Sequence, residues 1–194
     1  MKNNMFVSKI SNEEISKLPL TKFSGETIII DSEEKLQKYL PLLENEKILG
    51  FDTETRPSFK KGRVNSMALL QLSSLSYAFL IRLNTIGLPN PIAKILADKN
   101  ITKIGVAIND DIKGLRKLNK FESDGFVDLQ NIVGNYNIEN KGLKKLAGII
   151  LEKRISKSQQ LSNWEAKELS EAQKIYAATD AWVCIKIFNE LKKY

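Results

Sequence analysis

The chain has 194 residues and a formal net charge of +7, and its mix of 42% hydrophobic and 27% charged residues is typical of a globular domain. It contains one cysteine, Cys184, and no histidine, which excludes an internal disulfide, a zinc site built on Cys or His, and nucleophilic sites of the Ser-His-Asp and Cys-His types. Any catalysis must therefore use carboxylates, tyrosine, lysine or a metal ion with oxygen ligands, and the positive charge indicates either a polyanionic partner or a lysine-rich solvated surface.

The N-terminal part of the chain predicts two helices and two strands. Ser11 as N-cap, with Glu14 three residues later, forms the pattern of a capping box and begins a short helix. The β-branched residues 26–30 predict a strand, and a helix that begins at 31–34 follows. Residues 47–54 then predict a second strand, which we expect in the centre of a sheet.

The middle of the chain predicts a β-meander. Residues 64–72 and 76–82 form two more strands, joined by the turn-like pair 73–74. Three consecutive strands with short connections favour antiparallel pairing and argue against an all-parallel, doubly wound fold. A helix at 89–98 and a short strand at 101–106 follow.

The last part of the chain predicts mainly helices. One begins at Asn109 or Asp110, a second covers residues 143–150, and a long closing helix covers residues 170–192. The polar residues 154–164 predict an irregular segment between them. The whole order predicts an α/β fold with a mixed sheet and helices on both faces.

These elements predict one domain at residues 25–194, preceded by an N-terminal extension at residues 1–24. The first residues lead into no sustained apolar segment, and no run of about 20 apolar residues follows, so neither a signal peptide nor a membrane span is predicted. We therefore expect an intracellular, cytoplasmic protein without a membrane partner.

Two carboxylates stand at the end of the predicted central strand, in the sequence Phe51-Asp52-Thr53-Glu54-Thr55. Side chains two positions apart in a strand share a face, so Asp52 and Glu54 project together. Two like charges about 4 Å apart repel each other by roughly 4 kcal/mol at an effective dielectric constant of 20. A positive group that relieves this repulsion is therefore expected at the site.

Further oxygen ligands are predicted in two places. The first is Asn109-Asp110-Asp111, where a strand ends and a helix begins. We expect Asn109 or Asp110 to cap the helix and Asp111 to face the site, and the spacing alone leaves this division nearly even. The second is Tyr176 with Asp180, one turn apart on the same face of the closing helix. An Asp among apolar helix residues is costly unless it is paired or liganded, and the alternative is a surface position.

This order of motifs resembles the 3′–5′ exonuclease domain of the RNase D and Werner-exonuclease group, the DEDDy type, whose fold is RNase H-like. That fold has an antiparallel meander followed by parallel strands, with helices on both faces. The resemblance extends from about residue 25 to residue 192 and is especially close to the Werner-type domain in the final block. The residues that bear it are those at 51–54, 68–72, 105–111, 157–164 and 176–181.

The resemblance implies a metal-dependent 3′–5′ exonuclease that acts on a single strand or on the 3′ end of a duplex and releases nucleoside 5′-monophosphates. It implies two divalent cations, Mg²⁺ or Mn²⁺, and a tyrosine that orients the attacking water. Alignment through residues 105–108 favours Asp111 over Asp110 as the third acid. The residues implied are the metal-binding acids Asp52, Glu54, Asp111 and Asp180 and the catalytic Tyr176.

Candidate contacts to nucleic acid lie in the basic loop after the acid pair and in the final block. Lysine and arginine would contact phosphates, and the aromatic side chain would stack against a terminal base. The alternative is an ordinary solvated basic loop. The candidates are Thr55, Phe59, Lys60, Lys61, Arg63 and Lys157.

Three other functions stay open at this stage. They are a non-catalytic nucleic-acid-binding module of the same fold, an endonuclease of the wider RNase H-like group, and a phosphodiesterase of short oligonucleotides. The intact set of four acids and Tyr176 argues against the first. The choice between DNA and RNA, which depends on a few contacts to the ribose 2′-hydroxyl, and the oligomeric state are left open as well.

Overall fold

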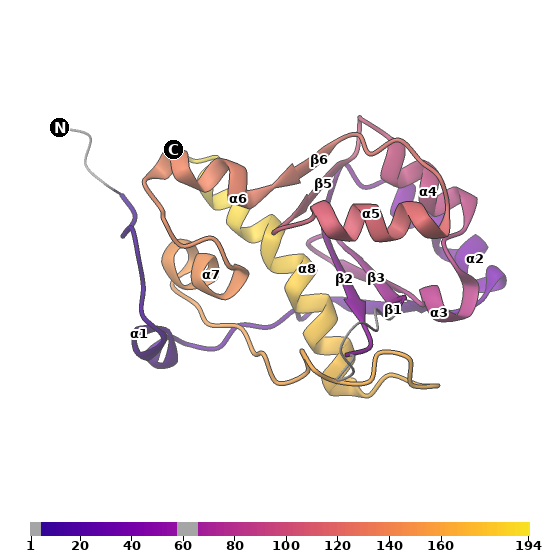
Figure 1. Ribbon diagram of the computed structural model, residues 1–194, viewed down its shortest axis with the longest axis horizontal. Coiled ribbons are helices and arrows are strands. Elements are labelled where there is room, and N and C mark those ends of the chain that lie inside the picture. Colours follow the sequence, from indigo (N-terminus) through magenta and orange to yellow (C-terminus); the bar gives the residue numbers. More distant parts are fainter. Residues whose placement is uncertain (1–4, 58–65) are drawn as a thin grey trace.

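The computed structural model describes residues 5–57 and 66–194. These residues form a six-stranded sheet in the order β1-β4-β3-β2-β5-β6, with helices on both of its faces (Figure 1). The strands are β1 (Glu26–Ile30), β2 (Ile48–Thr55), β3 (Met67–Ser73), β4 (Tyr77–Ile81), β5 (Thr102–Gly105) and β6 (Phe126–Asp128).

The sheet is mixed, as the order of the elements predicts. Strands β2, β3 and β4 pair antiparallel in chain order. Strand β1 pairs parallel with β4, β5 with β2, and β6 with β5. The predicted α/β architecture, an antiparallel meander followed by parallel strands, is therefore confirmed, and β2 lies inside the sheet between β3 and β5.

The helices largely follow the predicted ranges. Ser11 and Ser170 each form the capping box that begins a helix. Two single-turn helices, α3 and α6, are not predicted, because one turn shows no apolar period. The helices are α1 (Asn12–Lys17), α2 (Glu33–Glu44), α3 (Leu83–Ile86), α4 (Asn90–Ala97), α5 (Asn109–Leu118), α6 (Leu129–Ile132), η1 (Val133–Tyr136), α7 (Leu143–Leu151) and α8 (Glu171–Leu191).

The two faces of the sheet are covered by different helices. One face packs against α2, α4 and α5 in a core of large apolar side chains such as Leu36, Phe51 and Ile92. The other face is covered by α7 and the long helix α8, with buried side chains such as Leu146 and Val183. Figure 1 shows α8 crossing this second face obliquely.

Helix α8 lies close to β2 and β3 because small residues meet at the contact. A β-carbon at Gly50 would lie 1.9 Å from the carbonyl oxygen of Ala181, so a larger residue does not fit there. Ala177 and Ala178 are fully buried in the same contact region. The hydroxyl of Ser73 donates a hydrogen bond to the carbonyl oxygen of Ala178 at 3.4 Å. This contact fixes the helix against the strands of the meander.

The segment before β1 packs against the domain. Ile15 in α1 is fully buried, and Lys145 Nζ on α7 donates a hydrogen bond to the carbonyl oxygen of Ile10 at 2.6 Å. The division into an extension at 1–24 and a domain at 25–194 stays a prediction, with the described part of the extension held against α7.

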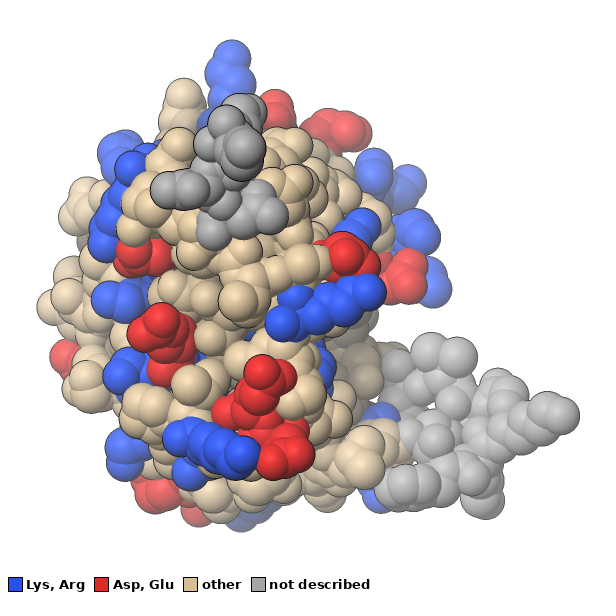
Figure 2. Space-filling model, turned by 90° about the vertical axis from the view of Figure 1, so that its left-hand side faces the viewer, with Lys and Arg blue, Asp and Glu red and all other residues tan. Residues whose placement is uncertain are grey.

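The surface to the left in Figure 1 bears charges of both signs. Figure 2 shows that Lys and Arg are interspersed there with Asp and Glu, rather than gathered in one basic patch. On this face, charge alone therefore does not mark a surface for nucleic acid. Within residues 5–57 and 66–194, every helix is too short or too polar to span a bilayer.

Candidate active site

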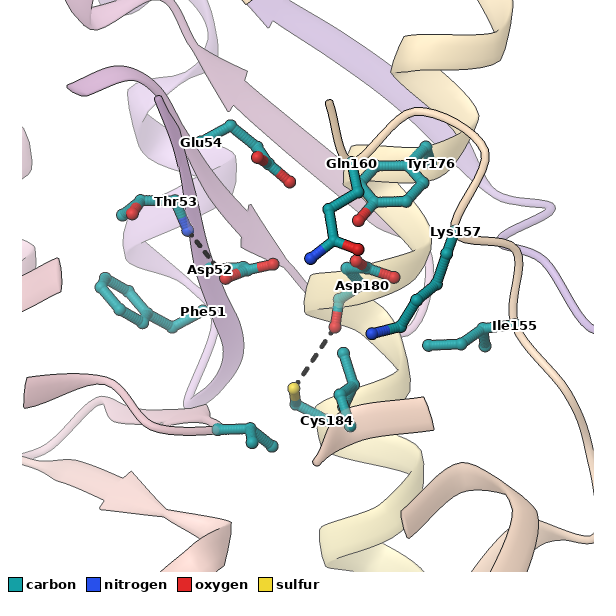
Figure 3. A pocket seen from close by; sticks show the side chains of 12 residues that line it. Phe51, Asp52, Thr53, Glu54, Ile155, Lys157, Gln160, Tyr176, Asp180 and Cys184 are labelled. Atoms are coloured by element: carbon teal, nitrogen blue, oxygen red, sulfur yellow. Dashed lines mark hydrogen bonds between the residues drawn. The ribbon is translucent and has the colours of Figure 1, made fainter. Parts of the chain in front are cut away.

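Three carboxylates from two elements meet beside β2. Asp52 and Glu54 project from the same side of the strand, and Asp180 faces them from α8 (Figure 3). One carboxylate oxygen of each residue lies within 4.8 Å of the others. Phe51, next to Asp52 in sequence, packs into the core on the other face. The alternation of a strand therefore directs both acids of β2 toward α8.

Asp111 flanks these acids from the first turn of α5. The hydroxyl of Thr53 donates a hydrogen bond to Asp111 Oδ1. Asp110, by contrast, is exposed, and its carboxylate accepts a hydrogen bond from Lys113 Nζ at 2.9 Å. The structure thus ties Asp111, and not Asp110, to the strand that bears the acid pair.

The backbone before α5 is held by Asp128, which the sequence pattern does not single out. Its carboxylate accepts hydrogen bonds from the N–H groups of Ala107 at 3.0 Å and Ile108 at 3.2 Å. Ala107 has a φ of 60°, a left-handed conformation that is strained for alanine. These bonds stabilise the turn, and the turn sets the direction in which α5 presents Asp111.

The expectation that Asn109 or Asp110 caps α5 is wrong. The helix begins at Asn109, and the N-cap position is Ile108. Among the described residues, no side chain caps the helix, and the N–H of Ile108 donates a hydrogen bond to the carboxylate of Asp128. The available signal was the position of Asp128 at a strand end, where it also caps α6 by accepting from Gln130 N at 2.9 Å.

Tyr176 and Asp180 lie on the face of α8 that is turned toward β2 (Figure 3). They are 6% and 7% exposed, so the alternative of a surface position for Asp180 is wrong. Within the described part of the chain, Asp180 Oδ1 is buried and has no hydrogen-bond partner. A buried acceptor left in this state costs about 1–3 kcal/mol, and a cation would satisfy it.

Burial and mutual repulsion raise the pKa values of the clustered acids. Burial raises the pKa of Asp52 well above its usual range, and the charges of Asp180 and Asp111 raise it further. Burial, followed by repulsion from the same acids and Asp52, raises the pKa of Glu54 to about 9. Burial raises the pKa of Asp180 to about 7, although a hydrogen bond with Tyr176 favours the charged form. The cluster is therefore short of positive charge, and its oxygen ligands fit Mg²⁺ or Mn²⁺.

A cavity of about 240 Å³ opens beside the acids. Lys157 and Gln160 line it from an irregular loop, defined here as residues 156–169, and Figure 3 shows the Lys157 side chain pointing toward Asp180. The sequence candidates did not include Gln160, because an uncharged residue in an irregular segment gives no directional signal. Cys184 Sγ donates a hydrogen bond to the carbonyl oxygen of Asp180 at 3.3 Å.

The 156–169 loop has a fixed position although it lies outside the helices and strands. Trp164 is fully buried and packs against Tyr176, with ring centroids 5.8 Å apart. Gln173 Nε2 donates a hydrogen bond to the carbonyl oxygen of Asn163 at 3.1 Å. These contacts hold the loop above the cavity.

The predicted nucleic-acid contacts fall into three groups. Lys157 lines the cavity. Thr55 is exposed at the end of β2, just after a register shift in its pairing with β3. Four candidates lie outside the described residues: Phe59, Lys60, Lys61 and Arg63.

The chain is similar to known 3′–5′ exonucleases in sequence. A family model described as 3'-5' exonuclease matches residues 27–194. The bifunctional 3'-5' exonuclease/ATP-dependent helicase WRN of Mus musculus is 32% identical over 151 residues, which are 74% of this chain and 11% of that protein. The exonuclease 3'-5' domain-containing protein 2 of Homo sapiens is 31% identical over 186 residues, which are 88% of this chain and 30% of that protein. The chain thus spans less than a third of these two relatives.

The structure is similar to a solved exonuclease domain. The crystal structure of the Aedes aegypti Nibbler EXO domain matches with a TM-score of 0.77 and 26% sequence identity, over 91% of this chain and 90% of that one. The expected RNase H-like exonuclease fold is therefore confirmed.

Proposed function

The chain belongs to the 3′–5′ exonuclease family, and on that premise we propose that it removes nucleotides one at a time from the 3′ end of a nucleic acid and releases nucleoside 5′-monophosphates. The supporting observation is the convergence of Asp52, Glu54 and Asp180 within 4.8 Å, on a cavity that Tyr176 also lines. Hydrolysis of a phosphodiester needs positive charge at the phosphate and an oriented water molecule, and this arrangement offers a place for each.

The acids Asp52, Glu54, Asp111 and Asp180 would hold two divalent cations, Mg²⁺ or Mn²⁺. When bound, the cations supply charge that stabilises the phosphate in the transition state and acidify the attacking water. The acids must release their protons to act as ligands. Because burial and its neighbours raise the pKa of Glu54 to about 9, metal affinity should increase with pH across the neutral range.

Tyr176 would orient the attacking water. Burial raises the pKa of Tyr176 above its usual value, and the charges of Asp180 and Glu54 raise it further. The phenol therefore stays protonated at neutral pH and acts as a hydrogen-bonding group instead of a base.

Lys157 would contact a phosphate of the substrate, since its side chain lines the cavity that the acids share. Gln160 lines the same cavity and offers a donor and an acceptor to a sugar or a base. The contacts predicted for Thr55 and for the basic loop that follows β2 stay predictions. The substrate is then a single strand, or the 3′ end of a duplex, threaded between β2 and the 156–169 loop.

The test is a 5′-labelled oligonucleotide incubated with the protein and Mn²⁺ and separated on a denaturing gel. We expect a ladder that shortens from the 3′ end. Asp52→Asn should lower the rate by on the order of 10³-fold, because it removes a ligand of the cations that would stabilise the reacting phosphate. Asp110→Asn is the matched control: it changes an exposed carboxylate in the same way and should leave the rate within about twofold.

Two results would contradict the proposal: a ladder that forms in the presence of a chelator, and undiminished activity of Asp52→Asn. Circular single-stranded DNA, incubated in parallel, should stay intact because an exonuclease requires an end. Cutting of the circle would identify an endonuclease instead.

A further inference from the structure

Four buried side-chain atoms have no hydrogen-bond partner among the residues that the structure describes. They are Nε2 and Oε1 of Gln71, Nε1 of Trp164 and Oδ1 of Asp180. Buried polar groups are nearly always paired, because an unpaired group loses its hydration without compensation. These three side chains lie on the side of the sheet that α8 covers, as strand pairing, the acid cluster and a shared apolar cluster indicate.

Gln71 lies in the centre of β3 and is fully buried. It is paired with Asp52 of β2 on one side and with Leu80 of β4 on the other, so the three side chains project from the same face of the sheet. Helix α8 covers this face, since Ser73, two positions further along β3, donates a hydrogen bond to Ala178 of the helix. Gln71 therefore lies enclosed between the sheet and α8.

Asp180 and Trp164 flank Gln71 on opposite sides. Toward β2, the neighbouring Asp52 has a carboxylate oxygen within 4.8 Å of one from Asp180. Toward β4, Trp164 belongs to the same buried apolar cluster as Leu80, the other cross-strand neighbour of Gln71. Gln71 thus lies in the strand between Asp52, which is close to Asp180, and Leu80, which shares an apolar cluster with Trp164.

The hydrogen-bonding capacities of the four atoms are complementary. An indole N–H only donates, an ionised carboxylate only accepts, and an amide offers one oxygen acceptor and an NH₂ donor. We propose that Trp164 Nε1 donates to Gln71 Oε1 and that Gln71 Nε2 donates to Asp180 Oδ1, each directly or through one buried water molecule. Gln71 is then a positioning residue for Asp180, an assignment that rests on the function proposed above.

Each bond of this chain has a distinct effect. The bond to Asp180 fixes the orientation of a metal-binding carboxylate and stabilises its charged form through a neutral donor. The bond from Trp164 sets the orientation of the amide, because an indole N–H can donate only to the amide oxygen and so leaves the NH₂ group for Asp180. Trp164 also anchors the 156–169 loop, so the loop that bears Lys157 is coupled to the acid cluster.

The test measures Mn²⁺ affinity in the absence of nucleic acid, by calorimetry or electron paramagnetic resonance. Gln71→Met keeps an unbranched side chain of similar length and removes both polar atoms. It should weaken Mn²⁺ binding by about tenfold, the usual effect of removing a residue that supports a metal ligand. Trp164→Phe should weaken it less, and the double variant should bind no more weakly than Gln71→Met, because both changes break one chain.

Ser73→Ala is the matched control. It removes another buried polar group from the same face of β3, one that bonds to Ala178 and not to the acids. Its Mn²⁺ affinity should stay within about twofold of that of the unaltered protein. An equally small change for Gln71→Met would overturn the proposal, and a simultaneous rise in its melting temperature would show that the amide is unpaired.

The unaltered protein offers a second test that does not depend on the folding of a variant. The sequence has two tryptophans, Trp164 and Trp182, and the latter packs against Phe23, with ring centroids 6.1 Å apart. The indole N–H resonance of Trp164 should exchange slowly with solvent and shift on addition of Mg²⁺, and that of Trp182 should not shift. A Trp164 resonance that is insensitive to Mg²⁺ would contradict the chain of hydrogen bonds.

The two proposals fail in different ways. If the Mn²⁺ affinities and the tryptophan resonance change as expected but no oligonucleotide is shortened, the positioning role of Gln71 is supported and the exonuclease function is contradicted. If the unaltered protein shortens oligonucleotides but Gln71→Met binds Mn²⁺ with unchanged affinity, the exonuclease function is supported and the positioning role of Gln71 is contradicted.

Discussion

The two faces of the sheet are built from different kinds of residue, although they share the same strands. On β3, Leu70 and Leu72 belong to the core under α2, α4 and α5, and Gln71 between them faces α8. The first face is filled by large interlocking side chains. The second has Gly50 and Ser73 at the contact with α8, where the helix backbone comes close to the strands. Both faces bury apolar side chains, and the small residues on the second face let α8 approach β2 closely enough for the acids of the two elements to meet.

The largest effect is expected on the packed face. Leu72→Ala should lower the free energy of unfolding by about 2–5 kcal/mol, because Leu72 is fully buried and its removal leaves a cavity. Ser73→Ala, its neighbour on the other face, should cost less than about 1.5 kcal/mol for one hydrogen bond. Urea denaturation of the metal-free protein measures both free energies of unfolding. Equal decreases in the two variants would contradict the expectation that the Leu72 face contributes more to stability.

The close contact on the second face can be broken by one methyl group. Gly50→Ala would place a β-carbon 1.9 Å from the carbonyl oxygen of Ala181, so α8 must move away from β2. A shift of about 1 Å in Asp180 should lower the exonuclease rate by on the order of 100-fold. Gly134→Ala is the control and should retain activity, because an added β-carbon there meets no atom of residues 5–57 and 66–194 within 4 Å.

The repulsion among the acids should appear as a pH dependence of stability without metal. The pKa of Glu54 rises from an ordinary 4.5 to about 9, so the folded state binds its proton more tightly than the unfolded state. Ionisation of Glu54 therefore destabilises the fold progressively between these pH values. Glu54→Gln should melt at a higher temperature than the unaltered protein in a chelator, by a margin that grows with pH over this range. If the difference in melting temperature between Glu54→Gln and the unaltered protein shrinks as the pH rises, ionisation of Glu54 does not destabilise the fold.

The smallest effect is expected at the entrance of the cavity. Lys157→Gln should raise KM by about threefold to tenfold and leave kcat nearly unchanged, because it removes one phosphate contact. Lys167→Gln alters an exposed lysine of the same loop outside the cavity lining and serves as the control. Steady-state kinetics of both variants at two salt concentrations measures KM and kcat, and only Lys157→Gln should show the raised KM. A loss of kcat in Lys157→Gln would instead indicate a role in the chemical step.

The sequence predicts the parts of the fold that depend on local patterns. The meander follows from three apolar runs with short connections, and α8 follows from Ser170 and the apolar spacing after it. Single turns such as α3 and α6 are too short to show a period. The turn before α5 depends on Asp128, which is about 20 residues away in sequence from the N–H groups that donate hydrogen bonds to it, so the residues of the turn themselves do not reveal this contact.

The residues of the site can likewise be predicted only where local patterns place them. The common face of Asp52 and Glu54 follows from strand alternation, and that of Tyr176 and Asp180 follows from helical spacing. The meeting of these two pairs depends on the small residues between β2 and α8, and the place of Gln71 depends on strand register. Neither is visible before the sheet is assembled.

The position of α8 as the last element of the sheet domain has a consequence for biosynthesis. A ribosome completes Asp52 and Glu54 long before it reaches Tyr176 and Asp180, which are 124 and 128 positions after Asp52. At about 5–20 residues per second this delay is roughly 6 to 25 seconds. Throughout that interval the nascent chain lacks Tyr176 and Asp180. On the function proposed above, we therefore expect activity only after α8 has emerged and docked, and a product truncated before α8 should not shorten an oligonucleotide.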